Sequence, residues 1–165
     1  FESEGLEAVL AWARDSGLTT LYPASTSHSG WFIHPHAHGR RAWMPEDGTV
    51  YFHPDPATWQ GCRLRPTVAR VAAATDWFAA AGAAAPRYGL DLAAWTVCCH
   101  NTALGLRHPE VTVRNCFGDS FPHALNPSHP DVRAYLAALV RNLATGYRPS
   151  VCAAGPNTCS SVCSG

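Results

Sequence analysis

The sequence predicts an α/β fold built on a parallel sheet. Two helix signals, over residues 3–16 and 67–88, are each followed by an apolar, β-prone run, at 18–22 and 90–99. A third helix signal covers residues 130–146. Helices that alternate with strands are typical of parallel sheets, because a parallel pair needs a crossover that a helix usually supplies.

The first helix–strand unit lies at the amino-terminal end. Ser3 can cap a helix whose apolar residues recur at helical spacing from Leu6 to Ala13, and Gly17 ends it. The run LTTLY that follows is β-prone, and Pro23 stops it. The segment after Pro23 is therefore expected at a strand end.

The second unit follows a long insertion. Residues 29–66 are predicted to be a loop that holds one short strand at 48–52. An Ala-rich helix is expected over 67–88. The run LDLAAWTVCC then predicts a strand buried on both faces, and it ends abruptly in the polar side chains of His100 and Asn101.

The carboxyl-terminal third holds one clear helix. Residues 102–130 are predicted to be a second long connection, after which Pro130 starts the helix and Gly146 ends it. The Cys-, Ser- and Gly-rich remainder favours irregular structure. The expected division is thus a domain at 1–147 and an irregular tail at 148–165.

Composition narrows the class of protein. The chain has 165 residues, and 47% are hydrophobic, which is enough to bury a core. Its 12 basic and 12 acidic residues balance, so charge gives no reason to expect a nucleic acid or an anionic membrane as partner. No apolar run reaches the roughly 18 residues of a membrane span, and the acidic amino-terminal stretch is unlike a signal peptide. The seven cysteines do not indicate a compartment, and we expect a cytoplasmic location.

Polar side chains at strand ends predict a ligand site. In α/β sheets the carboxyl ends of the strands face the ligand crevice, so His28, His100 and Asn101 are expected to converge there. Imidazole and amide groups can hydrogen-bond sugar hydroxyls, although a histidine with only a structural role fits the same position. Asp119, after Gly118, is either a further contact or a turn former. No phosphate- or dinucleotide-binding motif is present, so no cofactor is predicted.

Three imidazoles at a spacing of two form another candidate site. In an extended segment His34, His36 and His38 would point the same way, which suits metal ligation. A solvated His-rich loop is the alternative, because Pro35 disfavours a regular strand.

Several segments resemble glycoside-hydrolase-like TIM barrels. Residues 126–135, NPSHPDVRAY, resemble a segment that precedes a barrel helix, and those at 46–55, 95–101, 108–110 and 115–119 resemble an uncharacterised bacterial branch. Over residues 5–147 the resemblance implies a (β/α)8 TIM barrel with long βα loops that acts on or binds carbohydrate.

The chain departs from that family after the last helix, where a strand with acidic residues at its end should follow. A complete barrel needs about 250 residues, so we expect a partial TIM barrel of two or three strands. It would be inactive alone, because the acidic strand ends are missing, and would self-associate through open sheet edges.

Two other hypotheses about the function stay open. Residues 30–39, GWFIHPHAHG, resemble the strand end GFIDxHxHG of metal-dependent amidohydrolases, although His34 replaces the usual Asp. That resemblance implies a hydrolase that uses His34, His36 and His38. The third reading is a non-catalytic carbohydrate-binding module that stacks sugar faces on aromatic side chains, namely Trp31, Trp43, Tyr51 and Trp59.

Overall fold

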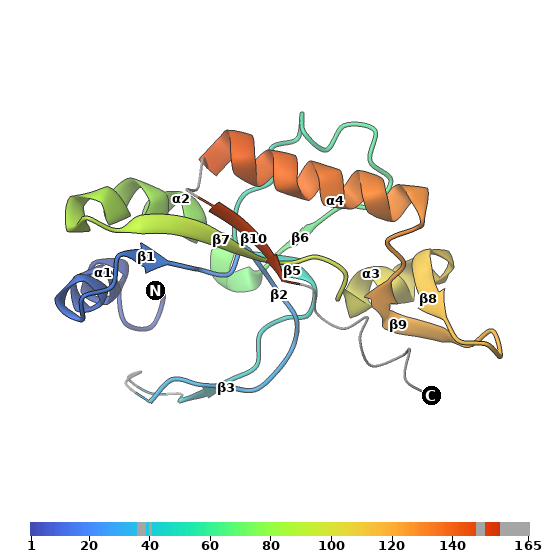
Figure 1. The fold of residues 1–165 in the computed structure, drawn as a ribbon. Coiled ribbons are helices and arrows are strands. Elements are labelled where there is room, and N and C mark those ends of the chain that lie inside the picture. The colour runs from blue at the N-terminus through green and yellow to red at the C-terminus, as the bar shows by residue number, and fades with distance from the viewer. Residues whose placement is uncertain (36–38, 40, 148–150, 156–165) are drawn as a thin grey trace.

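Strand β7 (Asp91–Val97) lies at the centre of the fold (Figure 1). It pairs in parallel with β1 (Thr20–Leu21) on one side and with β10 (Val151–Gly155) on the other. An isolated parallel bridge between Ala24 and Trp95 continues the β1 pairing along β7. The computed structural model describes residues 1–35, 39, 41–147 and 151–155.

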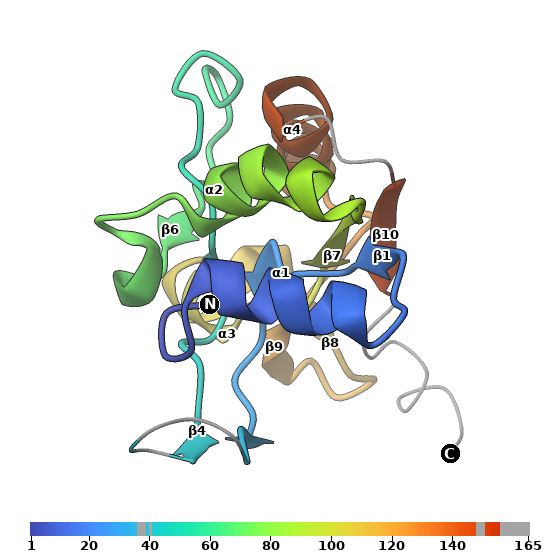
Figure 2. The same cartoon turned by 90° about the vertical axis from the view of Figure 1, so that its left-hand side faces the viewer.

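Three helices pack around this sheet (Figure 2). Helix α1 (Leu6–Asp15) is capped by Ser16 and followed by Gly17, whose φ of 75° suits glycine. Helix α2 (Trp77–Ala84) begins at Asp76, whose carboxylate accepts a hydrogen bond from the amide of Ala79. Helix α4 (Pro130–Asn142) carries Pro at its first position. Each end therefore follows from a local sequence signal.

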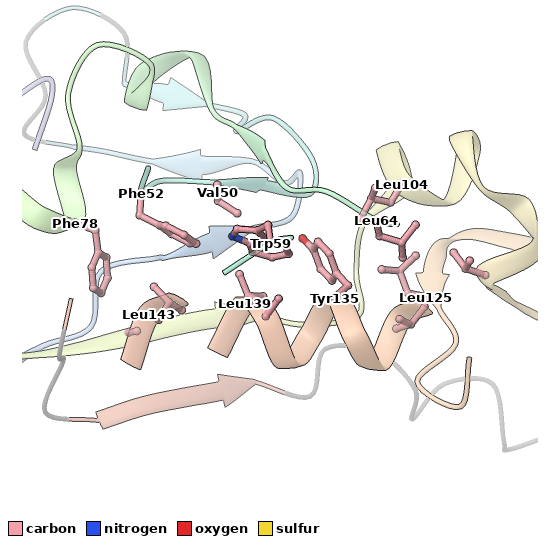
Figure 3. Packing of buried hydrophobic residues seen from close by; sticks show 14 of the residues in the cluster. Val50, Phe52, Trp59, Leu64, Phe78, Leu104, Leu125, Tyr135, Leu139 and Leu143 are labelled. Atoms are coloured by element: carbon pink, nitrogen blue, oxygen red, sulfur yellow. The ribbon is translucent and has the colours of Figure 1, made fainter. Parts of the chain in front are cut away.

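The main core lies between α4, α2 and the loop after β5 (Figure 3). Tyr135 and Leu139 of α4 face Phe52 and Trp59, and all of them are almost completely buried. The indole nitrogen of Trp59 donates to the Asn142 side chain at 2.8 Å, so the loop is tied to the helix. A second cluster joins α1 to the segment that leads into β7, through Leu10, Ala13, Ala84, Ala85 and Leu90.

Two small sheets lie in the region between β1 and α2. Strand β2 (Thr26–Ser27) is antiparallel to β5 (Thr49–Val50), which is parallel to β6 (Thr67–Val68). Strands β3 (Phe32–Ile33) and β4 (Ala42–Trp43) form a hairpin that projects from the body (Figures 1 and 2).

The segment after β7 folds into helix α3 (Thr102–Arg107) and a hairpin of β8 (Thr112–Arg114) and β9 (Ser120–Leu125). Short helical turns connect the larger elements, at Arg70–Ala72, Ala85–Tyr88, Pro109–Val111 and Leu143–Tyr147. None of the helices in the described residues combines the length and apolar character that crossing a bilayer requires.

The predicted partial TIM barrel is wrong. The described residues form separate sheets of two or three strands, and these do not close or join into a barrel. The physical reason is that the connections expected as long βα loops pair with themselves instead, as the antiparallel hairpins β3–β4 and β8–β9. The parallel direction expected for the runs at 18–22 and 90–99 is confirmed by the pairing of β1 with β7.

Two element predictions also need correction. The helix expected over 67–88 is a short strand and a 3-10 turn before α2, because the Asp76 cap delays the helix start. The tail expected to be irregular contains β10. This strand forms because it pairs in parallel with the open edge of β7.

Candidate functional site

Histidines from three elements form a row at the carboxyl end of β7. The ring centroids of His28 and His100 are 5.2 Å apart, and those of His100 and His123 are 5.5 Å apart. His28 comes close to His100 because the segment that carries His28 runs beside β7. In that segment the amide of Ser25 donates a hydrogen bond to the Trp95 carbonyl at 2.8 Å. The predicted convergence of His28 and His100 is therefore confirmed.

A carboxylate stands beside this histidine row. Asp47 Oδ1 lies 3.4 Å from His100 Nε2. The backbone amides of Ser29 and Thr102 donate to the same carboxylate at 3.0 and 2.5 Å. Burial acts to raise the pKa of Asp47, but these hydrogen bonds and the nearby His100 outweigh it and lower the pKa. Asp47 is thus held as a carboxylate that joins three loops.

The imidazole at the centre of the row favours its neutral form. Burial lowers the pKa of His100, and the neighbouring His28 and His123 act in the same direction against the opposing effect of Asp47. His28 Nδ1 is buried without a hydrogen-bond partner in the described structure. A neutral imidazole both donates and accepts hydrogen bonds, so the partly exposed rings of the row can contact a polar, uncharged group.

Metal ligation finds no support within the described residues. No group of three or more His, Cys, Asp or Glu side chains there is placed to hold an ion. Of the predicted triplet, His36 and His38 lie outside the described residues. His34 lies beside β3, and its ring meets that of Trp43 edge-on at 6.1 Å.

Asn101 has a positioning role. Its side chain caps α3, with Oδ1 accepting from the Leu104 amide at 2.8 Å and Nδ2 donating to the Gly48 carbonyl at 3.0 Å. The residue is only 4% exposed. Gly48 lies so close that a Cβ there would be 2.2 Å from Asn101 Cγ. The amide of Asn101 is therefore occupied by backbone groups on both sides.

Asp119 lies in the exposed turn between β8 and β9. Its amide donates to Asn115 Oδ1 at 2.9 Å, and its carboxylate accepts from Asn115 Nδ2 at 3.0 Å. These bonds fit the turn-forming alternative considered for this residue.

An aromatic cleft lies on the other side of the segment that carries His28. The cleft has a volume of about 750 Å³. Ser27 lines it, and successive side chains of an extended segment point to opposite faces, which separates the cleft from the histidine row. The aromatic side chains that line it come from the chain start, the hairpin, the residue after β5 and α2, namely Phe1, Phe32, Trp43, Tyr51, Trp77 and Phe78.

Local contacts fix the aromatic walls. The indole nitrogen of Trp77 donates to the Val71 carbonyl at 2.8 Å, and the amide of Tyr51 donates to the Ser25 carbonyl at 2.9 Å. Burial raises the pKa of Tyr51, which therefore stays a neutral phenol. Trp43 belongs to the projecting β3–β4 hairpin, so one wall of the cleft comes from an element outside the main body.

Acidic side chains border the cleft. Glu2 and Glu4 line it and are exposed, and among the described lining residues none is Arg or Lys. A smaller hollow of about 280 Å³ adjoins the cleft and shares Glu2, Trp43 and Tyr51 with it. The carboxylate there, Glu46, is paired with Arg70.

The sequence pointed to only part of this cleft. Of the four aromatic residues considered for sugar stacking, Trp43 and Tyr51 line the cleft. Trp31 is 74% exposed beside β3, whereas Trp59 is 2% exposed in the core. Trp77 was assigned to the predicted helix, and nothing in its local sequence indicates that its ring faces a cleft.

Comparison with known proteins gives one structural likeness. No family model matches the chain, and no curated protein sequence matches it. A solved structure described as a noncanonic maltogenic alpha-amylase, AmyB from Thermotoga neapolitana, matches with a TM-score of 0.51 and 16% identity. The match covers 90% of this chain and 33% of the amylase chain, so this chain spans about a third of that protein's length. At this identity the likeness shows the fold alone.

Proposed function

We propose that the chain binds carbohydrate, with sugar rings held in the aromatic cleft. The observation that carries the proposal is the combination of Trp43, Tyr51 and Trp77 around one open volume of about 750 Å³. Pyranose rings present apolar C–H faces that pack on aromatic rings, and their hydroxyls need polar groups nearby. Glu2 and Ser27 supply such groups at the lining.

Two further facts support this choice. The volume falls within the roughly 300–1,000 Å³ that is usual for small-molecule sites. The shared fold with a protein described as a maltogenic alpha-amylase makes α-linked gluco-oligosaccharides the first ligands to test.

We propose binding without hydrolysis. A glycosidase needs two carboxyl groups on opposite sides of the scissile bond, about 5–10 Å apart. The carboxylates that line the cleft, Glu2 and Glu4, come from the same short stretch and are exposed. Glu46 beside them is paired with Arg70. This supports a binding role, and clear turnover of aryl glycosides or polysaccharides by the purified chain would overturn it.

The histidine row is proposed as a second contact point for sugar hydroxyls. The observation that favours it is the approach of the partly exposed His28 and His100 rings, whose centroids lie 5.2 Å apart. The variants His28→Phe and His100→Phe keep a ring and remove the nitrogens. Loss of a hydrogen bond to ligand should weaken binding by about two- to tenfold, and unchanged affinity would remove the row from the site.

Calorimetric titration with maltoheptaose tests the main proposal. Trp43→Ala should weaken binding by about fivefold or more, because a stacking surface is lost. Trp31→Ala is the matched control, since Trp31 lies on the same hairpin but outside the cleft lining. Equal affinities for the two variants, or no binding of any oligosaccharide by the unmodified chain, would contradict the proposal.

A further inference from the structure

We infer that the cleft selects amino sugars, meaning saccharides that carry a free, protonated amine, over neutral and acidic ones. The inference rests on the proposed carbohydrate function and names the substrate class of the same cleft. Two independent features of the lining lead to it, namely its charge and its aromatic faces.

The charged side chains of the lining are negative, and the amino group of Phe1 is the positive group in the same stretch. Glu2 and Glu4 are exposed carboxylates at the cleft, and neither belongs to an ion pair among the described residues. The described lining has no Arg, and the chain has no Lys anywhere. Arg70, at the adjoining hollow, is paired with Glu46. An ammonium group is therefore attracted, and a carboxylate or sulfate on a sugar is repelled.

The aromatic walls act in the same direction. The face of an aromatic ring is electron-rich and attracts cations, most strongly for Trp and next for Tyr. Trp43, Tyr51 and Trp77 all line the cleft. An amino sugar can use both properties, because its C–H face stacks on a ring while its ammonium group reaches the carboxylates or a second ring.

The expected selectivity is moderate. Glu2 and Glu4 are exposed, so water and salt screen their charge, and each pair with an ammonium contributes at most about fivefold in affinity. We expect a β-1,4-linked glucosamine tetramer to bind about three- to tenfold more tightly than cellotetraose at low ionic strength. The difference should shrink above about 0.15 M salt, where the Debye length falls below about 8 Å.

A ligand series with one backbone tests the inference. Titrations compare the glucosamine tetramer, its N-acetylated counterpart and cellotetraose, at a pH at which the free amines are protonated, with a uronic-acid tetramer as the acidic probe. The double variant Glu2→Gln/Glu4→Gln should reduce the preference to the part that the aromatic rings contribute, and it should keep binding of cellotetraose. Asp15→Asn/Asp91→Asn is the control, because it removes the same net charge from exposed positions outside the lining.

The results of these titrations test the inference and the proposed function separately. Cellotetraose that binds as tightly as the glucosamine tetramer overturns the inference and leaves carbohydrate binding intact. A preference that the double glutamine variant leaves unchanged also overturns it, because Glu2 and Glu4 would then contribute nothing to the selection of amines. Failure of every tetramer to bind overturns the inference, and the proposed function falls with it only if maltoheptaose also fails to bind.

Discussion

Replacement of Asn101 by Ala should destabilise the fold rather than weaken ligand binding directly. The Asn101 side chain caps α3 through the Leu104 amide and also donates to the Gly48 carbonyl. Ala removes both hydrogen bonds at once. The Gly48 carbonyl lies in a buried turn and would lose its donor.

The magnitude follows from these two bonds. Loss of an N-cap side chain costs about 0.5–2 kcal/mol. A buried carbonyl left without its donor costs about 1–3 kcal/mol. The two contributions share one side chain and are not strictly additive, so Asn101→Ala should lower the free energy of unfolding by about 2–4 kcal/mol.

Urea unfolding followed by circular dichroism measures this change. Asn101→Ser is the matched control, because its hydroxyl retains a capping acceptor but cannot reach Gly48 with an amide, and its loss should be intermediate. A loss below about 1 kcal/mol for Asn101→Ala would refute the reasoning. Unchanged stability with lost saccharide affinity would instead restore Asn101 as a ligand contact.

Three further predictions test the packing, the histidine row and the sheet edges. Gly105→Ala should destabilise by several kcal/mol, since a Cβ there would lie 1.8 Å from the Pro122 carbonyl oxygen. Gly82→Ala in α2 is the control and should be neutral or stabilising by about 0.5–1 kcal/mol. If thermal unfolding shows similar losses of stability for the two variants, the packing of α3 on β9 is contradicted. Because the pKa of His100 is lowered from 6.5 in the folded chain, the unfolded chain binds the proton first, so stability should fall as the pH drops below 6.5. His100→Phe should flatten that decline between pH 5 and 7. An unchanged dependence of stability on pH in this variant would mean that other groups cause the decline. The outer edges of β1 and β10, the first of which leads into the 54% exposed Tyr22, should promote self-association, and a sharp monomer peak in size-exclusion chromatography across concentrations would count against it.

Long periodic signals were the parts of the fold that sequence could predict. The helix from Pro130 and the strand before His100 match the structure closely, and so does the end of the helix before Gly17, whereas that helix begins at Leu6 after Gly5 and is not capped by Ser3. Each combines an apolar period with a residue that starts or stops the element. The meeting of His28 with His100 followed from the parallel direction of their segments alone.

Short elements depended on contacts that a local pattern does not contain. The barrel expectation failed because the long connections form the hairpins β3–β4 and β8–β9, and strand propensity does not specify which segments pair. Asn101 carried a usable signal, since Asn before a helical turn is a good N-cap.

The residues of the two candidate sites could also be predicted only in part from the sequence. His123 joins the histidine row only because the β8–β9 hairpin folds back beside α3, and its local sequence gave no indication of this. The cleft assembles Glu2, Trp43 and Trp77 from positions far apart in the chain. Sites of this kind become visible only once the elements are placed in space.

Nuclear Overhauser contacts between a bound oligosaccharide and the aromatic protons of the chain test the central claim most directly. The account predicts contacts from sugar ring protons to the side chains of Trp43, Tyr51 and Trp77, with none to Trp31. Contacts confined to the exposed indole of Trp31, or to rings outside the cleft, would contradict it.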